Sequence, residues 1–169
     1  DGLDIEAVKQ AKSNSGKVTD SQAGKAMTGD ELLALDVDVL ALAALENQIH
    51  CDNVNEVKAG AILEIANGPL TSDADHSLAN RNVPVLPDVL ANTGGVIVSY
   101  FEWLQNRAGE KWSEAQVNER LDVLLREEAS KVLTRAGVED ITYRQAAYRQ
   151  GIERIAAAIM ARGNCQDCR

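Results

Sequence analysis

Three short apolar runs constrain the fold of this 169-residue chain more than any other feature. They lie at residues 37–43, 61–66 and 83–86, and each has the length of a buried strand. The stretches between them, 53–59 and 72–80, have helical character, and Thr71 or Ser72 caps the second. Alternating strands and helices predict an α/β fold whose parallel sheet is covered by helices on both faces.

Beyond Gly94 the pattern predicts helices alone. Val96, Tyr100 and Trp103 recur at helical spacing in the first of them. Capping boxes begin the next two, at Ser113–Gln116 and Thr142–Gln145, and a further box stands upstream at Thr28–Glu31. Glycines are expected to end these two helices, at Gly137 and Gly163, and the last helix carries an apolar face at Tyr148, Ile152, Ile155 and Ile159.

Composition argues against some kinds of binding partner and favours one cellular compartment. The formal net charge of −9 argues against a nucleic-acid partner, since such binding depends on cationic side chains that neutralise phosphates. No apolar run approaches the ~18 residues of a membrane span, and no secretory signal is visible. Three cysteines suit a reduced, cytoplasmic protein.

The size of the predicted sheet and the first residue both favour a fragment. Three strands make a small sheet for an isolated domain, and the chain opens on Asp1, with its first methionine at Met27. We therefore expect further strands upstream of Asp1. A natural species of about 18 kDa, detected by mass spectrometry, would instead favour a short binding protein.

Two asparagine–glycine segments follow strands of the predicted sheet. Asn67-Gly68 comes after the second run, and Asn92 to Gly95 come after the third and directly before a helix. Ligands of open parallel sheets bind outside the carboxyl ends of the strands, and amide side chains suit a carboxamide or sugar hydroxyls. Both segments are equally compatible with simple turns.

Ser99 is a second candidate ligand-binding residue. It lies in the first turns of the helix that follows Gly95, where a hydroxyl could bind a substrate carboxylate. Its hydroxyl could equally donate to a carbonyl of its own helix.

Metal and redox sites are not predicted. Cys165 and Cys168 have the spacing of a metal knuckle, but they stand in a tail after Gly163 and lack further ligands. His50 and His76 are interpreted as surface residues without a positioned partner, and Cys51 adds no spacing that completes a site.

Three segments resemble one known family, the glutamate dehydrogenases, within the wider group of glutamate, leucine, phenylalanine and valine dehydrogenases. They are residues 43–49, 64–69 and 87–103, and their order and spacing match as well. The sequence departs from the family at Ile65 and Leu70, where glycine and threonine are usual. The resemblance implies a Rossmann-like, doubly wound sheet of three layers, followed by C-terminal helices.

The resemblance also implies roles for single residues. Four would lie against an NAD or NADP cofactor, with the asparagines at its nicotinamide–ribose end: Ala43, Ala44, Asn67 and Asn92. Val96 and Ser99 would face the substrate side chain, and Ser99 would bind the distal carboxylate of glutamate.

By the same resemblance, the parent enzyme oxidatively deaminates L-glutamate to 2-oxoglutarate and ammonia, reversibly, as a cytoplasmic homo-hexamer. Residues 1–92 would form the C-terminal half of its dinucleotide-binding domain, residues 93–163 a helical segment leading to a substrate domain, and residues 164–169 a flexible tail. The family's catalytic lysine and aspartate match no residue here, so we expect the chain alone to be inactive. The alternatives are a non-catalytic binding paralogue and a dehydrogenase of another amino acid.

Overall fold

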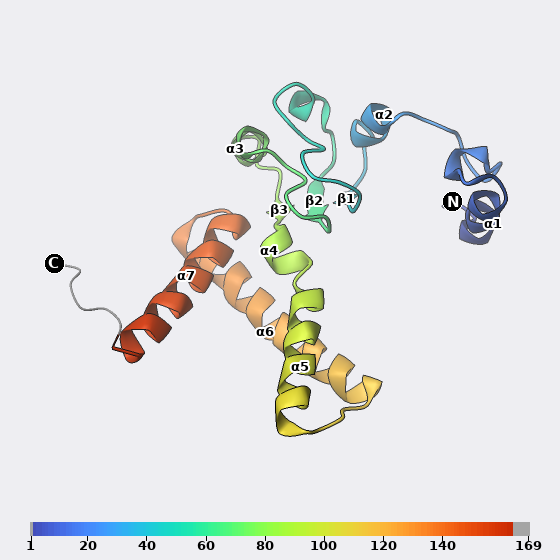
Figure 1. Cartoon of the computed structure of the whole chain (residues 1–169). Coiled ribbons are helices and arrows are strands. Elements are labelled where there is room, and N and C mark those ends of the chain that lie inside the picture. Colours follow the sequence, from blue (N-terminus) through green and yellow to red (C-terminus); the bar gives the residue numbers. More distant parts are fainter. Residues whose placement is uncertain (1, 164–169) are drawn as a thin grey trace.

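A three-stranded parallel sheet stands at the centre of the computed structural model, which describes residues 2–163 (Figure 1). Its strands are β1 (Val39–Leu42), β2 (Ala61–Glu64) and β3 (Val85–Leu86), in the order β1-β2-β3. Val39 pairs with Ala61, and Ile62 pairs with Val85. The predicted parallel α/β sheet is therefore confirmed, and its strands are shorter than the apolar runs.

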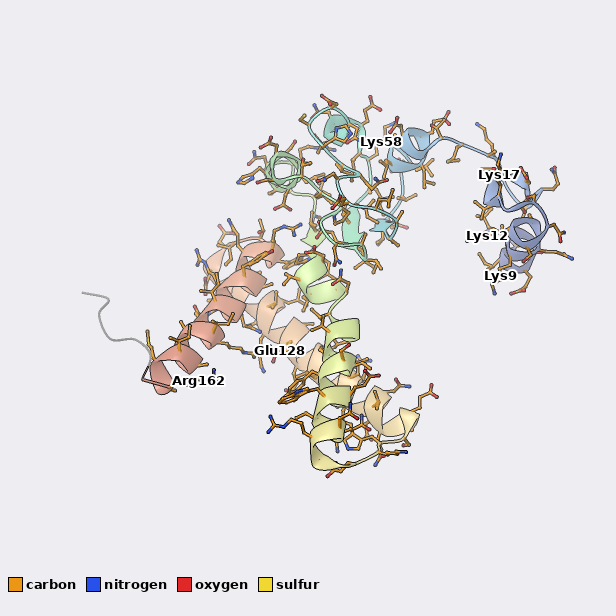
Figure 2. The ribbon with its side chains drawn as sticks, in the orientation of Figure 1. Lys9, Lys12, Lys17, Lys58, Glu128 and Arg162 are labelled. Atoms are coloured by element: carbon orange, nitrogen blue, oxygen red, sulfur yellow. The ribbon has the colours of Figure 1, made fainter. Side chains whose placement is uncertain are left out.

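The N-terminal region lies apart from this sheet. Helix α1 (Ile5–Ser15) packs mainly against the 3₁₀ turn η1 (Val18–Asp20), and an extended segment joins this pair to α2 (Gly29–Leu33) (Figure 1). Lys9, Lys12 and Lys17 project from the detached pair (Figure 2). The predicted capping box is present at α2, where the Thr28 side chain accepts from the Glu31 amide.

The helix predicted at residues 53–59 is wrong. Only a 3₁₀ turn, η2 (Val54–Glu56), forms there. The Asn53 side chain accepts from the His50 amide at 2.9 Å and donates to the Gln48 carbonyl at 2.9 Å, so it stabilises a local turn in place of a helix. The next connection follows the prediction, since α3 (Ser72–Asn80) begins at a Thr71 cap.

Four helices complete the described chain: α4 (Asp88–Ala91), α5 (Gly94–Ala108), α6 (Glu114–Glu139) and α7 (Tyr143–Ala161). Both predicted capping boxes are present, at Ser113 and Thr142. The predicted stop at Gly137 is wrong, because α6 continues through it. The helix ends where Asp140 adopts a left-handed conformation, at φ 52°, and its amide donates to the Ala136 carbonyl.

Two clusters of apolar side chains hold this architecture together. One joins the sheet to α3 and the intervening loops, with Leu40, Ile49, Ile62 and Leu78 at its centre. The other joins α4 to α6 and α7 through Leu90, Val132, Ala136 and Ala146. The carboxyl ends of the strands lie between the two clusters, because α4 follows β3 directly.

The apolar face predicted for the last helix forms, but it is solvent-exposed. Tyr148, Ile152, Ile155 and Ile159 are 52%, 62%, 62% and 45% exposed. No helix within residues 2–163 is long and apolar enough to cross a membrane.

Candidate functional site

An open cleft of about 690 Å³ lies beyond the carboxyl ends of β1 and β2. Small side chains and two amides dominate its walls. The lining residues directly follow β1, β2 and α4 or lie at the start of α5. The lining residues are Ala43, Ala44, Leu45, Glu46, Ile65, Ala66, Asn67, Asn92, Gly95 and Val96. Five of the six residues predicted to bind cofactor or substrate are among them, and Ser99 is not.

The two asparagines contact each other across the cleft wall. The Asn92 side-chain nitrogen donates to Asn67 Oδ1 at 2.7 Å and to the Ile65 carbonyl at 3.1 Å. Within the described residues, Asn67 Nδ2 and Asn92 Oδ1 make no hydrogen bond. The pair therefore keeps one amide nitrogen and one amide oxygen without a partner among residues 2–163.

Backbone hydrogen bonds hold the turn that carries Asn67. The Asn47 amide donates to the Gly68 carbonyl at 2.9 Å, and the Ile49 amide donates to the Pro69 carbonyl at 3.0 Å. Gly68 has φ 54°, a left-handed conformation that glycine adopts without steric cost. The loop after β1 and the turn after β2 thus form one continuous wall.

The first turns of α5 extend this wall. Val96 is 74% exposed at the edge of the cleft, and Ser99 is exposed about one turn further along. The Thr93 hydroxyl donates to the Leu90 carbonyl at 3.0 Å. The Ser99 hydroxyl makes no such bond among residues 2–163, so the alternative in which it donates to its own helix is not the arrangement observed.

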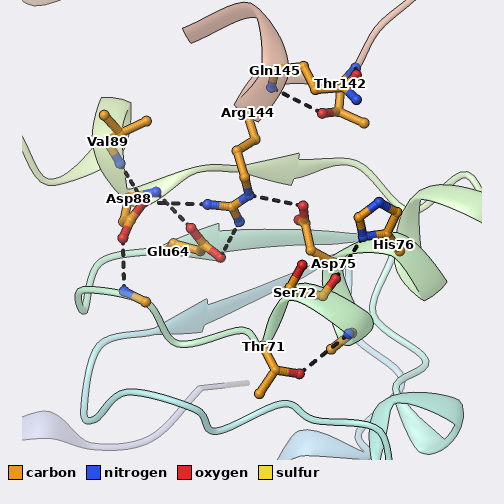
Figure 3. Close-up of polar contacts among 12 residues, drawn as sticks. Glu64, Thr71, Ser72, Asp75, His76, Asp88, Val89, Thr142, Arg144 and Gln145 are labelled. Atoms are coloured by element: carbon orange, nitrogen blue, oxygen red, sulfur yellow. Dashed lines mark hydrogen bonds and ion pairs between the residues drawn. The ribbon is translucent and has the colours of Figure 1, made fainter. Parts of the chain in front are cut away.

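A cluster of ionic side chains surrounds Arg144 (Figure 3). Arg144 of α7 donates to Glu64 at 2.6 Å, to Asp75 at 3.0 Å and to Asp88 at 3.5 Å. Burial acts to lower the pKa of Arg144, but the hydrogen bonds to Glu64 and Asp75 outweigh it, so the pKa lies above its ordinary value. Arg144 therefore stays charged and joins β2, α3, α4 and α7.

Sequence reasoning missed this cluster. Glu64 is fully buried although it stands within the second apolar run of the sequence. The available signal was the charge itself, because a carboxylate inside a buried strand requires a partner. Nothing in the sequence indicated that Arg144, 80 residues away, would be that partner.

The remaining candidates lie outside the cleft. His50, Cys51 and Asp52 bring their ligand atoms within 4.8 Å of one another, and His50 Nδ1 is 3.5 Å from Asp52, so His50 has a neighbour that was not expected. These three consecutive residues sit on a largely exposed turn. His76 is exposed, as predicted. Cys165 and Cys168 lie outside the described residues.

The sequence matches one family of known proteins. Residues 1–163 match the family model of the glutamate/leucine/phenylalanine/valine dehydrogenases. The chain is 48% identical over 146 residues to an NADP-specific glutamate dehydrogenase of Synechocystis, covering 86% of this chain and 34% of that protein. It is 40% identical over 163 residues to a cryptic catabolic NAD-specific glutamate dehydrogenase of Bacillus subtilis, covering 96% and 38%.

A solved structure agrees as well. The hetero-hexameric glutamate dehydrogenase of Thermus thermophilus, in a leucine-bound form, superposes with a TM-score of 0.84 at 30% identity, covering 95% of this chain and 38% of that one. The chain thus spans little more than a third of the proteins it resembles. On these matches, the chain belongs to the glutamate/leucine/phenylalanine/valine dehydrogenase family.

Proposed function

We propose that this chain is the C-terminal part of a glutamate dehydrogenase, which interconverts L-glutamate with 2-oxoglutarate and ammonia using NAD or NADP. The observation that carries the proposal is the cleft at the carboxyl ends of β1 and β2, where Ala43, Ala44, Asn67 and Asn92 meet. In open parallel sheets this is where dinucleotides bind.

The cleft fits the nicotinamide end of such a cofactor. A carboxamide presents one acceptor oxygen and one donor nitrogen, and the asparagine pair keeps one group of each complementary kind. Ala43 and Ala44 are exposed and have small side chains, so a planar ring can approach the backbone. When bound, the cofactor supplies hydride chemistry, while the chain binds and orients it.

Val96 and Ser99 would contact the substrate. Both are exposed on the first turns of α5, next to the cleft. A free serine hydroxyl near a helix N-terminus favours a carboxylate, and this supports glutamate over an amino acid with an apolar side chain. The similar proteins of Synechocystis and Bacillus subtilis are glutamate dehydrogenases, which supports that choice.

We assign the proton-transfer chemistry to a part of the enzyme outside this chain. Residues 1–92 are assigned to the dinucleotide-binding domain and residues 93–163 to a helical segment that leads to the substrate domain. The proton-transferring lysine and aspartate would lie in that substrate domain. We further propose a cytoplasmic homo-hexamer. The hetero-hexameric glutamate dehydrogenase of Thermus thermophilus supports the number of subunits but not their identity.

The direct test is glutamate-dependent reduction of NAD and of NADP by the longer protein that contains this chain, with the 169-residue chain assayed in parallel. We expect activity in the longer protein and none in the chain alone. Absence of activity with both cofactors would contradict the proposal. Ser99→Ala should raise the KM for glutamate while changing that for NAD(P) little, and an unchanged KM for glutamate would point to another amino-acid substrate.

A further inference from the structure

We propose that Arg144 is a positioning residue for the nicotinamide end of the cleft, acting through Glu64 and Asp88 on the turn that carries Asn67. The inference rests on the proposed function, because it assigns a role within the same site. Among residues 2–163, the hydrogen bonds of Arg144 go to Glu64, Asp75 and Asp88, and none of these three lines the cleft.

The first step joins α7 to β2. The Arg144 guanidinium donates to Glu64 Oε1 at 2.6 Å, and Glu64 is fully buried. A buried carboxylate stays ionised only when cationic and hydrogen-bonding partners compensate its lost hydration. Arg144 supplies the positive charge, so the position of the Glu64 carboxylate depends on α7.

The second step joins β2 to the cleft. Glu64 Oε2 accepts from the Asp88 amide at 2.8 Å, at the start of α4. Asp88 Oδ2 in turn accepts from the Gly68 amide at 2.8 Å, in the turn directly after Asn67. Asp88 Oδ1 also receives a longer bond from Arg144, at 3.5 Å. These contacts lead from one guanidinium to the backbone beside Asn67 (Figure 3).

The third step explains why both asparagines depend on this path. Asn67 precedes Gly68, and α4 leads from Asp88 to Asn92. The two side chains then meet at 2.7 Å. Moving Asp88 would shift the two turns relative to each other. It would therefore misplace the Asn67 side-chain nitrogen and the Asn92 side-chain oxygen, the two groups proposed to bind the nicotinamide.

The charges of the cluster make arginine necessary. Glu64, Asp75 and Asp88 surround a single cation, and their side chains are 0%, 22% and 19% exposed. A guanidinium reaches all three through separate nitrogens, as observed. A lysine ammonium is a point charge without that planar set of donors, so Arg144→Lys keeps the charge but cannot hold the three carboxylates in place.

Two control variants separate positioning from folding. Arg135 has a similar exposure, 25%, and forms an ion pair between α6 and α7, with Glu153 at 2.7 Å. Within residues 2–163 it makes no ion pair with β2 or α4. Asp75→Asn weakens the α3 branch of the same cluster and leaves the path to Gly68 intact. Arg135→Lys and Asp75→Asn should therefore leave the cleft unchanged.

The first measurement is amide hydrogen exchange by NMR on the 169-residue chain. In Arg144→Lys, we expect the Gly68 and Asp88 amides to exchange at least about tenfold faster, because the carboxylates that accept them are no longer held. In the two controls these amides should exchange as in the wild type. If Arg144→Lys does not fold, Glu64→Gln replaces it, since it removes the carboxylate that accepts from Asp88.

The second measurement is binding to the longer enzyme. Arg144→Lys should raise the Kd for NAD and NADP about tenfold, because misplaced amide groups lose the equivalent of about one or two hydrogen bonds to the nicotinamide. The Kd for ADP, which lacks the nicotinamide, should change less than about twofold. Equal losses for ADP and the dinucleotides, or equal losses in Arg135→Lys, would reduce Arg144 to a stabilising residue and overturn the inference.

The two proposals fail in different ways. A wild-type enzyme that binds NAD(P) but does not oxidise glutamate refutes the proposed function, and the Kd comparison still decides the role of Arg144. If the wild-type enzyme oxidises glutamate and Arg144→Lys behaves like its controls in both measurements, only the role of Arg144 is refuted. A wild-type enzyme that binds neither dinucleotide refutes both.

Discussion

At the residue scale, Asn92 links two turns that lie 25 residues apart in the sequence. Its side-chain nitrogen is shared between Asn67 and the Ile65 carbonyl, and its oxygen makes no hydrogen bond within the described residues. The partner groups lie at an exposed cleft, where water replaces a lost hydrogen bond at moderate cost. Asn92 should therefore matter more for binding than for stability.

Asn92→Ala tests this expectation. We expect the free energy of unfolding of the chain to fall by about 1 kcal/mol, since two hydrogen bonds to exposed acceptors are lost. In the longer enzyme the Kd for NAD(P) should rise about tenfold, which corresponds to about 1.4 kcal/mol of binding free energy. Urea unfolding and cofactor titration measure these quantities. Asn80→Ala, at an exposed position of α3, is the control, and an unchanged Kd in Asn92→Ala would contradict the assignment.

Glu128 shows how a single carboxylate joins two helices. It lies on α6 (Figure 2) and accepts from Arg154 at 2.8 Å and from Gln150 at 2.6 Å, both on α7. The hydrogen bond from Arg154 lowers the pKa of Glu128; burial acts in the opposite direction, and Lys131 adds a further lowering. The ionised form is thus favoured in the folded chain.

A lowered pKa in the folded state determines the sign of the pH dependence. The stabilisation by Glu128 is fully present above its unfolded pKa, near 4.5, and is lost as the pH falls through the lower folded value. Glu128→Gln should therefore be less stable than the wild type above about pH 4.5, and the difference should shrink in more acidic solution. Urea unfolding from pH 7 to pH 3 measures it. Glu127→Gln, whose side chain is 60% exposed, should show no comparable change.

At the scale of the element, the C-terminal helices show how far local signals determine helix ends. The Ser113 side chain accepts from the Gln116 amide, and the Gln116 side chain accepts from the Ser113 amide, so two free amides at the start of α6 are satisfied. The other end depends on a left-handed residue, and Asp140 adopts that conformation beyond Gly137, the residue at which the helix was expected to end.

Two serines of α6 allow a matched test of the cap. Ser113→Ala should reduce the free energy of unfolding by about 1 kcal/mol, because the amides at the helix start lose their acceptor. Ser130→Ala, at an exposed interior position of the same helix, should be neutral or slightly stabilising, since alanine has the higher helix propensity. Urea unfolding compares the two, and equal losses would show that the cap contributes nothing specific.

At the scale of the whole molecule, the described chain has two apolar cores and an uncovered apolar surface. The second core contains Val132, which is 2% exposed, whereas Ile155 on the neighbouring helix is 62% exposed. We expect the rest of the longer enzyme to cover the face of α7 that carries Ile155, because a large exposed apolar face is typical of a contact surface. Such a face contributes nothing to the stability of the chain alone.

This difference predicts opposite outcomes for two substitutions. In the isolated chain, Val132→Ala should cost about 2 kcal/mol of unfolding free energy, and Ile155→Ser should stay within about 0.5 kcal/mol. In the longer enzyme, Ile155→Ser should lower the Tm by several degrees, because the isoleucine would then be buried. Thermal unfolding of both proteins provides the comparison, and an unchanged Tm in the enzyme would show that this face stays exposed.

The sequence by itself determined the features that depend on neighbouring residues. The three strands, the helix caps at Thr28, Ser113 and Thr142, and the placement of both asparagine turns after strands all follow from local periodicity and side-chain chemistry. The exceptions have local causes too, such as the Asn53 side chain that stabilises a turn in place of a helix. The two turns could be expected at one edge because parallel strands end on the same side.

Only the tertiary structure decided which distant side chains meet. The contact between Asn92 and Asn67, the pairing of buried Glu64 with Arg144, and the exposure of the apolar face of α7 join or separate residues that carry no local signal of each other. A charge in a strand indicates that a partner is needed, but the partner's identity depends on how the helices pack. Packing is a property of the whole chain, because each buried contact depends on the position of every element around it.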